Sequence, residues 1–133
     1  MASITCTSGT VSAIESGLVL KGIAAETLGV GAPVKFGVSG LVELAVSTEW
    51  LATGTGGQCD FDGIVIQRYV ANDAVTVYGK GCVIGNFAAG MTAGQALWID
   101  SVPGSLSNVP VAAAGTDELV AKAISTVDIL VKR

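Results

Sequence analysis

The chain has 133 residues, of which half are hydrophobic and 14% are charged. This length is typical of one domain with one compact core, and the hydrophobic content excludes a disordered chain. Seven basic residues against eleven acidic ones give a net charge of −4. Because that sign repels phosphates, which proteins bind through released counterions, we expect no nucleic-acid partner.

The sequence contains no histidine. This absence removes the commonest general base, the Ser-His and Cys-His pairs of nucleophilic catalysis, and every metal site that uses an imidazole ligand. A Ser-Lys dyad stays open as an alternative, but nothing marks one pair of residues. We therefore expect a protein that is not an enzyme and that carries no cofactor.

Cys6, Cys59 and Cys82 are odd in number and far apart, so they form no metal or redox motif. We interpret them as buried thiols in a reducing compartment, with one disulfide or a reactive thiol as the alternatives. The first 17 residues lack the basic and apolar regions of a signal peptide, and no apolar run has the length of a membrane span. We expect neither secretion by the general route nor a membrane partner.

Short apolar runs rich in Val, Ile and Thr, separated by Gly, Asn, Asp and Pro, predict an all-β fold with little helix. Residues 1 to 17 are small and polar and are predicted to form an extended N-terminal arm, which leaves residues 18 to 133 as a single β-rich domain that folds without it. The strands expected in that domain are, in chain order, Leu18–Lys21, Pro33–Phe36, Leu41–Leu44, Gly63–Gln67, Ala74–Tyr78, Ala96–Asp100, Glu118–Ile124 and Asp128–Lys132.

One turn pattern recurs before these strands, at Gly31, Asn72 and Gly94. Each of these residues tolerates a positive φ and is followed by two small or polar residues and then by an apolar-x-apolar strand. The unequal spacing excludes a solenoid and indicates repeated hairpin turns. Val102–Leu106 is predicted to contain a type II turn, with Pro103 and Gly104 at its centre.

Three short motifs resemble fragments of ligand sites. Thr53–Gly57 is rich in glycine but lacks the Lys and the helix of a phosphate-binding loop, so we interpret it as a surface loop. Asp60–Gly63 lacks the later ligands of a calcium loop and is interpreted as a turn. Lys80 is flanked by glycines but lacks the methionines of a biotin-carrying hairpin, and is interpreted as a solvated turn.

Four aromatic residues offer a different function. Trp50, Tyr69, Tyr78 and Trp98 could form a platform on which a sugar ring stacks. Aromatic residues make up 5% of the chain, and their simpler role is in the core and at its rim. A carbohydrate-binding or adhesion module that uses Trp50, Tyr69 or Trp98 remains the alternative function.

The segment Asp62–Asp100 resembles the small head decoration, or cement, proteins of tailed bacteriophages. The resemblance is carried by Gly63–Val65, the polar turn Ala71–Asp73, the strand Val75–Tyr78 and the turn Gly79–Gly81. Gly94–Asp100 is similar to a Gly-x-Ala-Val/Leu-Tyr/Trp-x-Asp segment of related phage structural proteins. Weaker similarity at Gly29–Val34, Ala123–Ile124 and Ile129–Val131 extends it over most of residues 28 to 133.

The resemblance implies a small β-barrel or β-tulip-like domain that forms a homotrimer on the capsid exterior, at three-fold or quasi-three-fold axes. Its partner would be the major capsid protein, and it would be made in the host cytoplasm and located in the virion. A polar arm could add a strand to an exposed capsid sheet edge. The arm residues expected to contact the capsid are Ser3, Ile4, Thr5, Thr7, Val11 and Ile14.

Overall fold

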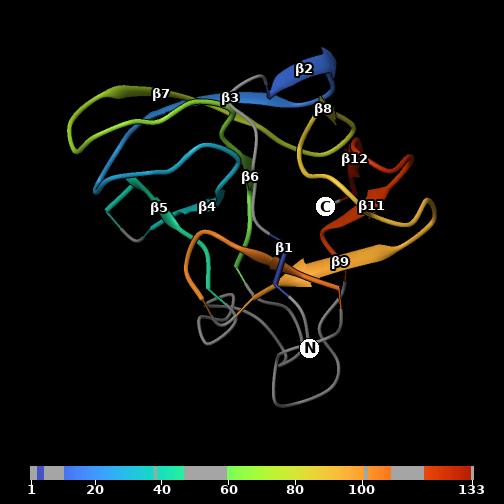
Figure 1. Ribbon diagram of the computed structural model, residues 1–133. Helices are drawn as coiled ribbons and strands as arrows, with labels where there is room; N and C mark the ends of the chain where they lie inside the picture. Colours follow the sequence, from blue (N-terminus) through green and yellow to red (C-terminus); the bar gives the residue numbers. More distant parts are fainter. Residues whose placement is uncertain are drawn as a thin grey trace.

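A computed structural model describes residues 11–37, 39–46, 60–100, 102–108 and 119–132, together with the backbone of residues 3 and 4. These residues form twelve β-strands in two sheets, and no helix occurs among them (Figure 1). Every strand pair within the sheets is antiparallel. The all-β prediction is confirmed.

The seven-stranded sheet contains the N-terminal and C-terminal parts of the described chain. Its strand order is β1-β10-β9-β11-β12-β8-β2, so that β1 and β2 lie at its two edges. The bounds are β1 Ser3–Ile4, β2 Ser12–Glu15, β8 Val83–Gly85, β9 Ala96–Ile99, β10 Leu106–Ser107, β11 Ala121–Ala123 and β12 Ile129–Val131.

The five-stranded sheet has the order β3-β7-β6-β4-β5. Its edge strands β3 and β5 approach each other at a parallel bridge between Ala24 and Val42, where the Ala25 amide donates to the Val42 carbonyl over 2.8 Å. This single bridge joins the two edges at the end of β3, so the sheet is curled, while the rest of β3 stays at an edge. The bounds are β3 Val19–Ile23, β4 Pro33–Phe36, β5 Val42–Leu44, β6 Gly63–Ile64 and β7 Ala74–Tyr78.

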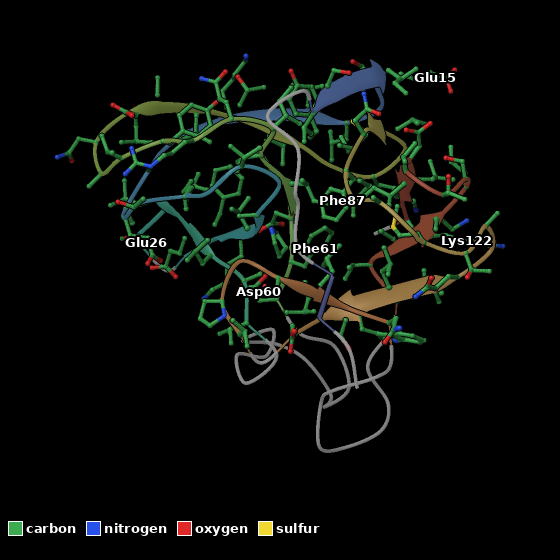
Figure 2. All side chains as sticks on the ribbon, viewed as in Figure 1. Glu15, Glu26, Asp60, Phe61, Phe87 and Lys122 are labelled. Carbon is green, nitrogen blue, oxygen red and sulfur yellow. The ribbon has the colours of Figure 1, made fainter. Side chains whose placement is uncertain are left out.

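Two hydrophobic cores hold these sheets, and β6 lies between them. Ile64 packs into the larger core with Phe61 and Phe87, which lie near the middle of the molecule in Figure 2. The next residue, Val65, packs into the smaller core inside the five-stranded sheet with Leu28. Because successive side chains of a strand point to opposite faces, this central segment is apolar on both sides and joins the sheets.

The repeated turn pattern is confirmed at all three predicted positions. Gly31, Asn72 and Gly94 have φ values of 75°, 77° and 90°, and in each turn the next residue's amide donates back to a carbonyl three residues earlier. The predicted type II turn is confirmed as well: Gly104 has φ 86°, and the Ser105 amide donates to the Val102 carbonyl over 3.2 Å.

Each of the three turns continues into a bulge against a buried partner residue. The Gly31 amide donates to the Val65 carbonyl, and the Val65 amide donates to the Ala32 carbonyl, so two residues oppose one. Asn72–Asp73 oppose Ala24 and Gly94–Gln95 oppose Ala123 in the same way. This is the bulge in which residue 1 needs a left-handed backbone. The bulge recurs at Gly81–Cys82, opposite Val131. A turn was predicted at Gly79–Gly81, but not as a member of this repeated pattern.

All eight predicted strands overlap observed ones, but four observed strands were not predicted: β1, β2, β8 and β10. Two of these, β1 and β10, have two residues each, and β8 ends in glycine. Polar β2, in the predicted arm, forms by pairing with β8. β6 is shorter than the predicted strand Gly63–Gln67, because the bulge opposite Val65 interrupts the regular pairing.

Candidate interaction surface

The arm residues expected to contact a capsid do not share one surface. Ser3 and Ile4 form β1, which pairs with β10 at one edge of the seven-stranded sheet. Ile14 lies in β2 at the opposite edge, with 57% of its surface exposed. The arm strands thus lie on two sides of the sheet.

The remaining predicted contacts differ in accessibility. Val11 is buried in the larger core, so its side chain stabilises the fold rather than facing a partner. Thr5 and Thr7 lie outside the described residues. Of the two predicted contacts whose side chains are described, Ile14 is the accessible one.

A longer accessible element contains Ile14. Residues 12–23, which we call the outer strand, comprise β2 and β3. The β2 half pairs with β8 at the edge of one sheet, and the β3 half pairs with β7 at the edge of the other. Figure 1 shows the two strands in succession along the top of the molecule, in blue. The outer strand therefore spans both sheets as one continuous border.

The outer strand crosses between the sheets at Gly17. A Cβ at this position would lie 2.4 Å from the Lys80 carbonyl oxygen and 2.8 Å from the Gly81 Cα. The buried Cys82 thiol sits at the same crossing, where it accepts from the Gly17 amide over 3.1 Å and donates to the Leu18 carbonyl over 3.4 Å. Close backbone contact and these bonds fix the position of the crossing.

One side of β3 presents main-chain groups that its own sheet does not use. Leu18 exchanges hydrogen bonds with the β7–β8 turn, since its amide donates to Lys80 and its carbonyl accepts from Gly79. In an antiparallel pair, alternate residues direct their amide and carbonyl groups to opposite sides. Val19 and Lys21 therefore point these groups away from β7, where β3 is the last strand of its sheet among the described residues.

Exposed aliphatic side chains gather on the outer strand. They are Ile14 at 57% exposed, Leu18 at 51%, Val19 at 38% and Ile23 at 42%. The parallel bridge at Ala24 and Val42 brings exposed Leu41 alongside Ile23 and extends the apolar surface toward β5. Several exposed apolar residues along one sheet border are typical of a protein interaction site.

The outer strand carries two charged residues of opposite sign. Glu15 is the last residue of β2, is exposed, and is labelled at the upper right of Figure 2. Lys21 is exposed in β3, and its Nζ donates to the Thr76 hydroxyl of β7 over 2.8 Å. Because Thr76 is neutral, the Lys21 charge is not compensated by that bond. The two charges lie three residues on either side of Leu18.

The fragments of ligand sites have structural roles where they are described. The Asp62 carboxylate accepts from the Phe36 amide over 2.8 Å, and Phe61 is buried in the larger core. Lys80 is exposed in the β7–β8 turn. Across the described ranges, no group of three or more His, Cys, Asp and Glu residues could hold a metal ion. The loop Thr53–Gly57 lies outside the described residues.

The four aromatic residues do not form a described platform. Tyr69 is buried in the smaller core, where its hydroxyl accepts from the Thr76 amide over 3.3 Å. Tyr78 packs against the larger core, and Trp98 is half-buried in β9 of the other sheet. Trp50, together with Cys6 and Cys59, lies outside the described residues. These positions add no support to carbohydrate binding.

The feature of the sequence that could have indicated this surface is the apolar character of both faces of the outer strand. The β3 half was predicted as a strand over Leu18–Lys21. Its inward positions are Leu20 and Gly22, and its outward positions include Val19 and Ile23. The outward face is thus as apolar as the inward one, which is unusual for a strand that borders solvent. The β2 half carries no such signal, because its segment is short and polar.

No family model matches this sequence, and no curated protein matches it significantly. In the part of the chain that is described, no helix is long and apolar enough to cross a membrane.

Proposed function

We propose that this protein is a structural virion protein: a capsid decoration protein that binds the outer surface of the major capsid protein lattice of a tailed bacteriophage. It stabilises the expanded head and acts as a homotrimer. It uses no cofactor and performs no catalysis.

The outer strand is the observation that carries the oligomeric part of the proposal. It combines exposed aliphatic side chains, main-chain groups of Val19 and Lys21 that no described strand of their sheet uses, and a position fixed by the Gly17 crossing. These are the features of a surface that binds other folded proteins, because apolar contact supplies affinity and free edge groups supply register. Small molecules instead bind in concave pockets.

The segment that resembles phage decoration proteins adds support. Asp62–Asp100 forms β6, β7, β8 and β9 and contributes to both sheets. It also contains three of the turns with bulges, at Asn72, Gly81 and Gly94. The similarity therefore covers the centre of the fold rather than one hairpin.

A closed lattice explains how a small protein of this kind stabilises a large shell. Each copy buries a modest area against the capsid, but many copies act together on one particle. A trimer multiplies the contacts of each unit further and covers edges that a single copy exposes. The stabilisation is then a property of the occupied lattice.

The proposal is tested by binding to heads that lack the protein. Heads of the encoding phage, assembled after deletion of this gene, are mixed with the purified protein and sedimented. We expect saturable binding to expanded heads at a fixed ratio to the major capsid protein, and much weaker binding to unexpanded heads. No binding to either form, with specific binding on a glycan array, would instead support the adhesion module.

A further inference from the structure

We propose that the outer strand is the contact through which copies of this chain associate, with Leu18 next to the symmetry axis and Glu15 of one copy facing Lys21 of the next. The inference rests on the oligomeric part of the proposed function and not on capsid binding. Self-association measured without capsids therefore tests it separately.

The exposed apolar residues are sufficient in area for a protein contact. Ile14, Leu18, Val19 and Ile23 together leave on the order of 300 Å² of surface exposed, within the range of the largest patch on a typical monomer. A standard interface buries about 800 Å² on each partner, of which somewhat more than half is non-polar. In a ring of three the outer strand contacts two neighbours, so the four residues supply part of the non-polar area of each contact.

The charge on the outer strand favours a second copy as the partner. The molecule carries a net charge of −4, but residues 12–23 contain one acid and one base and are neutral. Two copies can therefore approach along this border without the repulsion that other acidic surfaces would cause. Aliphatic side chains of one copy can also pack against the same side chains of another copy around a symmetry axis, so the contact needs no second kind of protein.

The order of the charges makes the border complementary to itself. Glu15 and Lys21 lie on opposite sides of Leu18 along the strand. When Leu18 approaches a symmetry axis, the Glu15 half of one copy lies against the Lys21 half of its neighbour. In a ring of three, each copy offers Glu15 to one neighbour and Lys21 to the other, so these two charges are paired at every contact and the ring closes.

The side of β3 that faces away from β7 has no partner strand along Val19–Gly22 among the described residues, which gives a further reason for coverage. Proteins protect exposed edge strands with proline, with several charges or with a covering segment. The β3 strand has no proline and one lysine, Lys21, whose side chain lies over Thr76 of its own sheet. Association of copies covers this edge and keeps other strands from adding to it.

Exposed aliphatic residues elsewhere supply a matched control. Val102 is 53% exposed, about as much as Leu18, but it lies in the turn with Pro103 and Gly104 and away from the outer strand. A single exposed aliphatic residue of this kind is normal on a protein surface. Lys122, exposed in β11, is the corresponding control for charge.

The experiment is sedimentation equilibrium of the purified full chain over a wide concentration range. Variants Leu18→Glu, Glu15→Lys, Lys21→Glu and the double swap Glu15→Lys/Lys21→Glu are compared with the controls Val102→Glu and Lys122→Glu. Circular dichroism and thermal unfolding verify that each variant is folded. Two salt concentrations separate the effect of charge from the effect of apolar contact.

We expect the wild type to self-associate and Leu18→Glu to weaken association by about a hundredfold, since a buried charge would lie at the axis. Each single charge reversal should weaken association about tenfold at low salt, and the double swap should restore it. The two controls should associate like the wild type. A monomeric wild type, unchanged association of folded Leu18→Glu, or a double swap weaker than both single reversals would overturn the inference.

Discussion

At the residue scale, glycines allow two backbone segments to approach more closely than a side chain would permit. Gly17 lies where the outer strand crosses the β7–β8 turn, and the space of a side chain there is already filled by backbone. Gly29 lies in a turn where a Cβ would have no neighbour within 4 Å, and its φ is not positive. Replacing each glycine by alanine therefore distinguishes the effect of steric crowding on stability from the general effect of losing a glycine.

We predict that Gly17→Ala lowers the free energy of unfolding by about 2 to 4 kcal/mol, because its Cβ would displace the Lys80 and Gly81 backbone. Gly29→Ala should leave that free energy unchanged or raise it by up to about 1 kcal/mol, by restricting the unfolded chain. Urea unfolding of both variants measures the difference. Equal stability of the two variants would mean that the crossing at Gly17 is not tightly packed.

At the element scale, the turn with its bulge is the repeated unit that begins several strands. It places a left-handed residue two positions before the first residue of β4, β7, β8 and β9. The sequence revealed three of these turns, since Gly or Asn preceded an apolar-x-apolar strand. A turn was also predicted at Gly79–Gly81, but the strand after it was not, because β8 is short and ends in Gly85.

Gly94→Ala tests the backbone requirement of this unit without crowding. Gly94 has φ 90°, and a Cβ there would meet no atom within 4 Å. The substitution should therefore lower the free energy of unfolding by about 1 to 2 kcal/mol through backbone strain alone. Asn72→Gly, at φ 77°, should be neutral or stabilising in the same denaturant experiment. A neutral Gly94→Ala would show that the turn adapts to a right-handed backbone.

The arm shows what the sequence could not predict at this scale. Residues 1 to 17 have few large aliphatic residues, which favoured an arm dispensable for folding. The structure pairs β2 with β8 and buries Val11 in the larger core. Both contacts depend on distant residues, and a short polar segment does not encode such contacts in its own pattern.

Two truncations separate the contributions within the arm. Deletion of residues 2–10 retains β2 and Val11 and should change the midpoint of thermal unfolding by no more than a few degrees. Deletion of residues 2–16 removes both and should lower the midpoint by about 5 to 10 °C, since burial of Val11 alone is worth about 1.5 to 3 kcal/mol. Differential scanning calorimetry compares them. Equal midpoints would show that residues 18–133 are stable without β2.

At the scale of the whole molecule, two sheets share one core and one border. The larger core takes Ile64 and Phe61 from the five-stranded side and Phe87 from the seven-stranded side. The outer strand lies along both sheets at the surface. The fold class and most strands could be predicted from alternation and turn residues. The interaction surface could not, because exposure of Ile14 and Leu18 depends on which strands end each sheet.

The proposed function concerns the stability of the expanded head, and its most direct test is the temperature at which heads release DNA. Expanded heads that lack the protein are heated in the presence of a fluorescent DNA dye, with increasing amounts of the purified chain. We expect the release temperature to rise with bound protein and to level off when the lattice is saturated. Heads that bind the protein to saturation but release DNA at an unchanged temperature would contradict a stabilising role.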